Sequence, residues 1–536
     1  MPRKNSAQLI ELNLSGFQAF KKASSIPIAP ITLIYGPNSA GKSAIYDALA
    51  LLRHFFSATA QTSGGTEWPF LDASSRRYAL ATDWHREQDE KYSDEPLVLS
   101  VTFASPDYRV FDPQLMTHRY LPFALINSQH GGSAIIKATV EFMGPWDQTR
   151  FNISIELNGT PLYRFREGDL AAFNIKHPAF GEEGARLPKC SQGQGNLSPV
   201  FIGSWAEIRG NVSMAGAHQI SWENLAKSLN PRDAAPVNPH VWYEALMEFA
   251  FVHNLLLGQL VRITHDACSF DLVEASRHIP KATELTFALT KDCEVADPAS
   301  LYFQLNSDIR YFEVACSATA LALKSSSKPS RRKRLADNGL LATNINQSLT
   351  DHLYTERGYR LDVELTKVSP EGQTNRIRKQ TPAWLVNLCL RDSAGRRLAF
   401  TDVGSGIGYV LPAIVALWTT RQCFLQQPEL HLHPALQASL GDALIEAASN
   451  GRSLLIETHS EHILLRILKR IRQTNSDPVR AGAYRIDPRD ISIIYCDPSP
   501  DGTTRAVTLK LTPEGEFVGR WPRGFFPERD GELFDE

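Results

Sequence analysis

The hydrophobic pattern near the N-terminus predicts two strands and a helix. Residues 9–14 alternate apolar and polar side chains as a half-buried strand does, and residues 31–35 form a continuous apolar run typical of a central strand. After a glycine-containing loop, apolar residues recur at helical spacing up to residue 56. This order of elements predicts a helix packed on a sheet, and hence an α/β fold.

The same reading divides the rest of the chain into three parts. Strand-like segments occupy 97–103, 135–143 and 151–157, helical stretches occupy 242–256 and 311–323, and strands resume at 359–365 and 384–390. The chain then alternates strand and helix to about 472, and Asp501-Gly502 predicts a closing hairpin. We therefore expect an N-terminal lobe over 1–199, a mainly helical inserted domain over 200–345, and a C-terminal lobe over 346–536.

The composition is that of a folded protein without a dominant charge. The chain has 536 residues, of which 43% are hydrophobic and 21% charged, so it is long enough for more than one core. Lysine and arginine total 56 against 58 acidic residues, which excludes a global field that attracts nucleic acid or membrane. The seven scattered cysteines, and the lack of a signal-like or membrane-spanning apolar stretch, predict a cytoplasmic protein with no membrane partner.

Residues 36–43 read GPNSAGKS and match the phosphate-loop pattern between a strand and a helix. Gly36 and Gly41 allow backbone amides to approach phosphate oxygens, Lys42 is predicted to reach the β and γ phosphates, and Ser43 to bind Mg²⁺ through its hydroxyl. The residues predicted to bind ATP here are Gly36, Pro37, Asn38, Ser39, Ala40, Gly41, Lys42, Ser43 and Ala44.

Three later segments follow in a characteristic order. Residues 401–412, TDVGSGIGYVLP, form a glycine-rich turn that opens a predicted helix. Residues 423–434, CFLQQPELHLHP, form a strand with a polar end and a histidine-rich loop, and a further strand ends at His459 in ETHSEH. Together with the phosphate loop, they resemble the signature motif, the Walker B strand with its D-loop, and the switch histidine of ABC and SMC-type ATPases.

The resemblance is closest to bacterial ABC/SMC-like ATPases of the overcoming-lysogenisation-defect type, over about 1–105 and 395–536. It implies an ABC-ATPase-like head with a mixed sheet and flanking helices. It also implies that Gly404, Ser405 and Gly406 of one copy contact the γ phosphate bound by Lys42 of another, which makes a head-to-tail dimer across ATP. His459 would then sense the γ phosphate.

The sequence departs from this family at the Walker B strand. Gln426 and Gln427 stand where the family carries an acid for Mg²⁺ and an acid that polarises the attacking water. Glutamine cannot act as a general base and is a weak substitute for an anion beside Mg²⁺, so slow hydrolysis is expected. Glu429 and Glu457 are the nearby carboxylates that could compensate, although Glu429 fits a solvated loop residue equally well.

The resemblance also indicates what the ATP-bound protein is expected to control. The chain after His459 is too short for the TOPRIM nuclease of some relatives, so we expect ATP to control a separately encoded nuclease or toxin subunit in anti-phage defence, with a Septu-type system as the specific suspicion. An actively hydrolysing, DNA-clamping repair or motor ATPase is the alternative, and an autonomous nuclease is a third possibility.

Three features leave two interpretations open. The basic run at 324–334 could bind DNA or RNA phosphates or be a solvated loop. Phe17 and Phe20 could lie beside the adenine or pack under the sheet. His431 and His433 have the H-x-H spacing of a metal pair, whereas the family resemblance assigns them to the D-loop.

Overall fold

The structure is a computed structural model of the whole chain. It describes residues 8–56, 96–105, 134–143, 150–166, 171–174, 197–200, 263–276, 285–289, 309–324, 340–367, 384–398, 400, 403–519 and 521–522. The chain forms two compact units, each assembled from segments far apart in sequence. The first holds residues 1–28, 37–269 and 496–507, and the second holds 29–36, 270–495 and 508–536.

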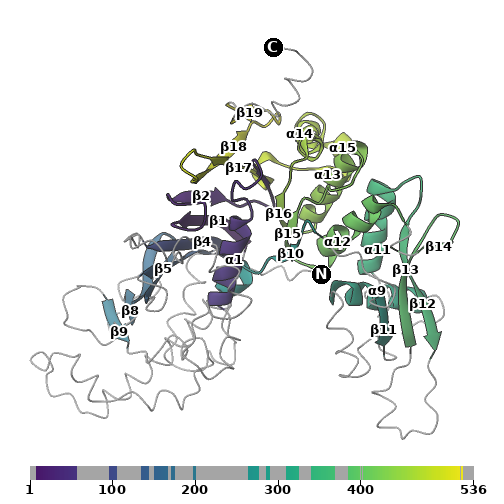
Figure 1. The fold of residues 1–536 in the computed structure, drawn as a ribbon, viewed down its shortest axis with the longest axis horizontal. Helices are drawn as coiled ribbons and strands as arrows, with labels where there is room; N and C mark the ends of the chain where they lie inside the picture. Colours follow the sequence, from purple (N-terminus) through teal and green to yellow (C-terminus); the bar gives the residue numbers. More distant parts are fainter. Residues whose placement is uncertain are drawn as a thin grey trace, which may run out of the picture. The chain divides into compact units, whose positions relative to one another are not determined.

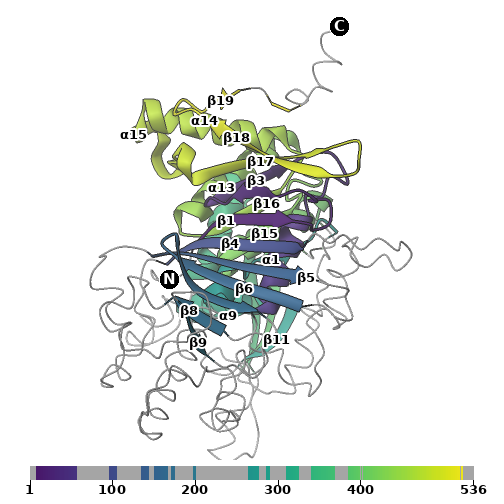
Figure 2. The ribbon, with the colours of Figure 1, turned by 90° about the vertical axis from the view of Figure 1, so that its left-hand side faces the viewer.

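An antiparallel sheet dominates the first unit, with the strand order β2-β1-β4-β5-β6-β7-β8-β9 (Figure 2). Its strands are β1 (Gln8–Ser15), β2 (Ser24–Pro27), β4 (Leu97–Ser105), β5 (Ala134–Met143), β6 (Arg150–Leu157), β7 (Thr160–Arg166), β8 (Ala171–Asn174) and β9 (Leu197–Val200). Helix α1 (Ala44–Phe55) contacts this sheet, since the rings of Phe55 and Phe142 lie 5.6 Å apart.

A seven-stranded sheet with the order β10-β15-β16-β3-β17-β18-β19 belongs mainly to the second unit. Its strands are β3 (Ile31–Tyr35), β10 (Asp271–Val273), β15 (Gln422–Gln426), β16 (Ser453–Glu457), β17 (Ile491–Pro498), β18 (Thr504–Leu511) and β19 (Phe517–Val518). The strands from β10 to β17 in this order pair in parallel. Every residue of β3 and β16 is buried, which explains why most of their residues are apolar.

Of the described helices of the second unit, some pack beside this sheet and others on the smaller sheet of the same unit, and α13 and α14 lie next to each other (Figure 1). They are α9 (Ile309–Lys324), α11 (Leu340–Gln347), α12 (Ser405–Thr419), α13 (Pro434–Ser449), α14 (Glu461–Ser476) and α15 (Pro478–Ala481), with the π-helix η8 (Ser348–Leu353) and the 3₁₀ turns η10 (Gly482–Tyr484) and η11 (Pro488–Asp490). In α14 the buried residues follow helical spacing, and Ser460 caps the helix by accepting from the Ile463 N–H at 3.2 Å.

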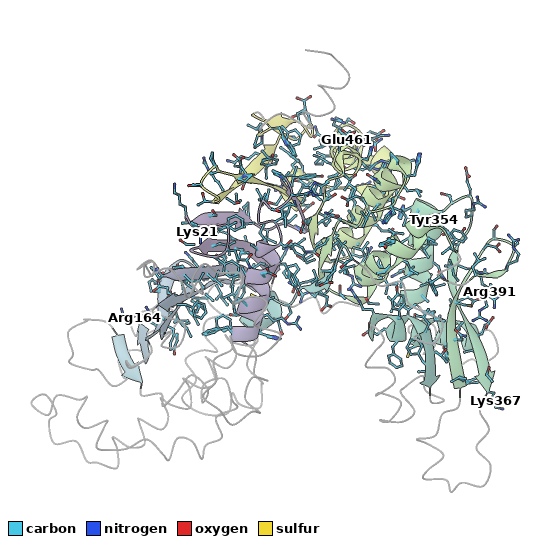
Figure 3. All side chains as sticks on the ribbon, viewed as in Figure 1. Lys21, Arg164, Tyr354, Lys367, Arg391 and Glu461 are labelled. Atoms are coloured by element: carbon cyan, nitrogen blue, oxygen red, sulfur yellow. The ribbon has the colours of Figure 1, made fainter. Side chains whose placement is uncertain are left out.

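A small antiparallel sheet completes the second unit, with the order β11-β13-β12 and β14 paired to β13. Its strands are β11 (Thr286–Leu289), β12 (Arg360–Lys367), β13 (Trp384–Arg391) and β14 (Arg397–Leu398). Arg391 ties β13 to β12 through Asp362 at 2.9 Å and Glu364 at 3.4 Å, and Figure 3 labels it beside these strands. Leu361 and Leu390, which pair in register, are both buried.

The predicted α/β class is confirmed, and most predicted elements are present. The apolar run at 31–35 is strand β3, and the helix after the phosphate loop begins at Ala44. The hairpin is also confirmed, because β17 and β18 are neighbours across a turn at Gly502, whose φ is 78°. The predicted helix at 242–256 and much of 200–345 lie outside the described residues, so the three-part division stays a prediction.

None of the described helices is both long enough and apolar enough to cross a membrane.

Candidate functional site

The phosphate loop begins where the buried strand β3 ends and leads directly into α1. Its backbone has a positive φ at three positions, Gly36 with φ 145°, Ser39 with φ 61° and Gly41 with φ 77°. Lys42 is only 4% exposed, and its Nζ donates to the Pro37 carbonyl at 2.8 Å, so the ammonium group is turned back over the loop. Hydrogen bonds from the Ala44 and Ile45 amides start the helix at the Gly41 and Lys42 carbonyls.

Close packing fixes the loop within the first unit. A Cβ on Gly41 would lie 2.8 Å from the Cβ of Ala19, so the position requires glycine for space as well as for φ. Thr504 donates from its hydroxyl to the Ala40 carbonyl at 3.1 Å. Phe17 and Phe20 are fully buried, which favours core packing over contact with adenine.

The two glutamines lie at the carboxyl end of β15. Gln426 pairs in register with Glu457 of β16, and Glu457 in turn pairs with Ile34 of β3. Gln427 leaves the strand with a φ of 44°, and its N–H donates to the Glu457 carbonyl at 2.7 Å. Because parallel strands end at the same edge, these residues gather where β3 leads into the phosphate loop.

The candidate switch histidine follows the carboxyl end of β16. His459 has an exposed side chain, and its backbone N–H donates to Glu429 Oε1 at 2.9 Å. Glu429 is 8% exposed, so its interpretation as a solvated loop residue is wrong. Tyr35 donates from its hydroxyl to the Ser460 carbonyl at 3.0 Å, which joins the end of β3 to the same segment.

The candidate signature turn opens α12, which begins at Ser405. A Cβ on Gly406 would lie 3.0 Å from the His431 carbonyl oxygen and 3.4 Å from the Tyr354 hydroxyl, so the turn packs against the loop after β15. At Gly404 a Cβ would meet no described atom within 4 Å. The Ser405 side chain lies outside the described atoms.

The histidine pair has local structural roles. His431 has a φ of 63°, and its ring lies 4.5 Å from the ring of Tyr409 on α12. His433 caps α13 by accepting from the Ala435 N–H at Nδ1, at 3.3 Å. Within the described part of the chain, no group of three or more histidine, cysteine or acidic side chains is arranged to hold a metal ion.

Within the second unit, these contacts bring together three of the predicted segments: the signature turn, the Walker B loop and the switch histidine. The phosphate loop from residue 37 onward belongs to the other unit. The basic run lies outside the described residues except for Lys324, the last residue of α9. The contacts of Tyr35, Tyr409 and Thr504 were not predicted from the sequence. Of the three residues, only Tyr35 has a position that could have marked it, immediately before the phosphate loop.

Two family models match parts of the chain. The model described as "AAA domain, putative AbiEii toxin, Type IV TA system" matches residues 330–466, which include the signature turn and His459. A model described as "AAA domain" matches residues 11–68, which include the phosphate loop. Comparison with curated proteins gave no match. The two matched segments support a P-loop ATPase of the AAA type and contain both halves of the predicted nucleotide site.

Solved SMC head structures are similar to the chain at low identity. An SMC head bound to the C-terminal winged-helix domain of ScpA is 11% identical with a TM-score of 0.37, covering 94% of this chain and 98% of that one. The head with an extended coiled coil from Pyrococcus furiosus is 12% identical with a TM-score of 0.36, covering 94% and 96%. The Thermotoga maritima head is 8% identical with a TM-score of 0.34, covering 94% and 100%.

Proposed function

We propose that this protein is an ATP-binding ATPase of the ABC/SMC type. The observation that carries the proposal is the phosphate loop, which follows a fully buried parallel strand and bends through left-handed Ser39 and Gly41 into α1. Such a loop directs backbone amides and a helix N-terminus at phosphate oxygens. Lys42 supplies the cation for the β and γ phosphates.

The phosphate loop fits a nucleoside triphosphate well, whereas the residues proposed to bind Mg²⁺ fit the metal less well. Because Gly41 has no Cβ, the loop backbone can lie close against Ala19, where a Cβ would be only 2.8 Å from the Ala19 Cβ. The proposed Mg²⁺ ligands are the Ser43 hydroxyl and the Gln426 amide oxygen, and both are neutral. Mg²⁺ bound there would neutralise phosphate charge, but with weaker support from the protein than a carboxylate gives.

We infer slow hydrolysis from the residues at the end of β15. Gln427 occupies the position that the family resemblance assigns to the general base, and an amide cannot accept the proton of an attacking water. ATP would therefore act mainly as a ligand whose binding maintains one conformational or assembly state of the protein. His459, with its backbone fixed and its side chain exposed, is the proposed γ-phosphate sensor.

We propose that the held state is a head-to-tail dimer. Gly404 is exposed at the start of α12, where a second copy's phosphates could approach the turn formed by Gly404, Ser405 and Gly406. This state would regulate a separately encoded nuclease or toxin subunit in anti-phage defence, and a Septu-type pairing is the specific form proposed. The support for this output is the sequence resemblance.

Equilibrium binding of fluorescent ATP to Lys42→Ala tests the main proposal. We expect at least about a tenfold loss of affinity, because the substitution removes the buried cation of the loop. The matched control is Lys22→Ala, which removes an exposed lysine from the same unit and should leave affinity unchanged. Affinity of Lys42→Ala within about threefold of wild type, or ~0.7 kcal/mol, would contradict ATP binding by this loop.

A further inference from the structure

Two side chains, one from the end of β3 and one from the loop after β15, form hydrogen bonds to the backbone segment that follows β16. The segment at His459 and Ser460 follows β16. Glu429, from the loop after β15, accepts the N–H of His459 at 2.9 Å, and Tyr35, the last residue of β3, donates to the carbonyl of Ser460 at 3.0 Å. All of these residues belong to the second unit, so the contacts lie within one compact body.

Tyr35 is well placed to act as a rigid donor. Its side chain is almost fully buried, and its ring lies 5.5 Å from the ring of Trp521 in an edge-to-face contact. Burial raises the pKa of Tyr35 well above its usual value, and the charge of Glu429 raises it further. The phenol therefore keeps its proton and remains a hydrogen-bond donor at neutral pH.

Glu429 acts here as an acceptor for a main-chain amide. Its Oε1 accepts the His459 N–H, and the residue as a whole is 8% exposed. An amide oxygen could accept the same hydrogen bond, whereas general-base catalysis requires a group that takes up a proton. The two roles therefore respond differently to replacement by glutamine.

We propose that Tyr35 and Glu429 are positioning residues that together fix the main chain of His459 and Ser460, and that Glu429 does not compensate as the water-activating base. The part that concerns turnover rests on the proposed ATPase function. The part that concerns the main chain of His459 and Ser460 does not depend on that function. The exposed His459 side chain is thereby presented from a backbone held on both sides.

Amide hydrogen exchange at His459 and Ser460 in the nucleotide-free, full-length protein tests the backbone contacts. We expect Glu429→Gln to exchange as slowly as wild type, because its amide oxygen keeps the acceptor. Glu429→Ala and Tyr35→Phe should each exchange faster, by about tenfold, since each loses one hydrogen bond. Tyr35→Phe keeps the aromatic ring and its packing, so it tests the proposal even where Glu429→Ala fails to fold. Wild-type exchange rates in Tyr35→Phe would overturn the proposal.

Single-turnover ATP hydrolysis, measured with the equilibrium affinity for ATP, separates positioning from base catalysis. The proposal expects Glu429→Gln to hydrolyse within about threefold of wild type and Glu429→Ala to fall about tenfold or more, with ATP affinity unchanged in both. Equal loss in Glu429→Gln and Glu429→Ala would identify the carboxylate as the base and overturn the assignment. Failure of wild type to bind ATP would refute the proposed function instead, and the exchange rates would still decide the backbone contacts.

Discussion

At the scale of single residues, the two glutamines after β15 set the expected rate of turnover. Their amides stand at the positions that the family resemblance assigns to a Mg²⁺ ligand and a general base. We predict that Gln426→Asp combined with Gln427→Glu raises steady-state phosphate release, because general-base catalysis typically contributes about 10²- to 10⁴-fold. The gain should fall short of the upper value, because in this chain the residues around the two positions have not been selected to orient a charged base.

Lys42→Ala is the blank for contaminating ATPase in this experiment. Two results together would contradict our assignment of the glutamines: wild-type turnover at an ordinary enzymatic rate, ~1 to 10 per second, and no gain in the double variant. Glu457, which pairs in register with Gln426, would then be the carboxylate to substitute next.

A second prediction at this scale concerns the substitution Gly41→Ala, for which Gly159→Ala is the matched control. Both have a φ close to 77°, but a Cβ on Gly41 would lie 2.8 Å from Ala19, while a Cβ on Gly159 would meet no described atom within 4 Å. We expect Gly159→Ala to cost about 1 kcal/mol, from the left-handed backbone alone. Gly41→Ala should lower the urea midpoint further and should also weaken ATP binding.

The comparison of the two alanine variants isolates the effect of close packing from the effect of φ. Equal urea midpoints with unchanged ATP affinity in Gly41→Ala would show that the loop relaxes freely, and that the tight contact with Ala19 does not shape the phosphate site.

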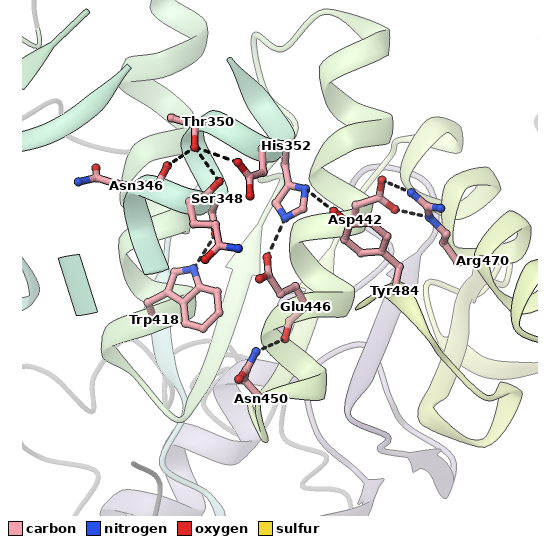
Figure 4. A network of polar contacts seen from close by, with 12 residues as sticks. Asn346, Ser348, Thr350, His352, Trp418, Asp442, Glu446, Asn450, Arg470 and Tyr484 are labelled. Atoms are coloured by element: carbon pink, nitrogen blue, oxygen red, sulfur yellow. Dashed lines mark hydrogen bonds and ion pairs between the residues drawn. The ribbon is translucent and has the colours of Figure 1, made fainter. Parts of the chain in front are cut away.

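At the scale of elements, buried polar contacts connect the helices that follow the predicted site segments (Figure 4). On α13, Asp442 accepts from Arg470 of α14 at 2.7 Å, and Arg470 also lies over the ring of Tyr484. Glu446, one turn further along α13, contacts His352 of the π-helix η8 at 2.7 Å. The Asp442–Arg470 pair holds α13 against α14, and the Glu446–His352 contact holds α13 against η8.

We predict that Asp442→Ala lowers the stability of the second unit by about 3 kcal/mol. The substitution leaves Arg466 and Arg470 without their shared, buried carboxylate, and breaking a buried ion pair on one side is strongly destabilising. Arg489→Ala is the control, because its side chain, which pairs with Asp487, is 89% exposed and such surface pairs contribute at most about 1 kcal/mol. Urea unfolding followed by far-ultraviolet circular dichroism measures both. Similar shifts in the two variants would contradict a structural role for the α13–α14 pair.

The elements themselves were predictable where local sequence decides them. The strands β3 and β16 are buried on both faces, so most of their residues are apolar, and α1 follows the phosphate loop as the motif requires. Contacts between distant segments were not predictable. Tyr35 reaches Ser460 across 425 positions, and Thr504 reaches Ala40 across 464, so no local pattern records either hydrogen bond. The burial of Glu429 depends on the same tertiary packing, which is why a solvated loop was equally consistent with the sequence.

At the scale of the whole molecule, the proposed head-to-tail dimer would complete the nucleotide site of one copy with the signature turn of the other. The signature turn lies at the start of α12, where Gly406 packs against the His431 carbonyl while Gly404 remains exposed. One face of the turn is therefore fixed by its own unit, and the other is available to a partner. This asymmetry is what a turn that contacts the γ phosphate across a dimer interface requires.

We predict that Ser405→Arg leaves ATP binding by the monomer intact and blocks the ATP-dependent dimer. An arginine at the first residue of α12 places a long, charged side chain where a second copy's nucleotide would approach the helix N-terminus. Its positive charge also opposes the partial positive charge of that terminus. Light scattering coupled to size exclusion, with and without ATP, measures the dimer, and fluorescent ATP measures the affinity of the monomer. Ser476→Arg adds the same side chain at the exposed end of α14 and should dimerise as wild type does. An unchanged ATP-dependent dimer in Ser405→Arg would mean that the signature turn lies outside the interface, and the site would then have to be complete within a single chain.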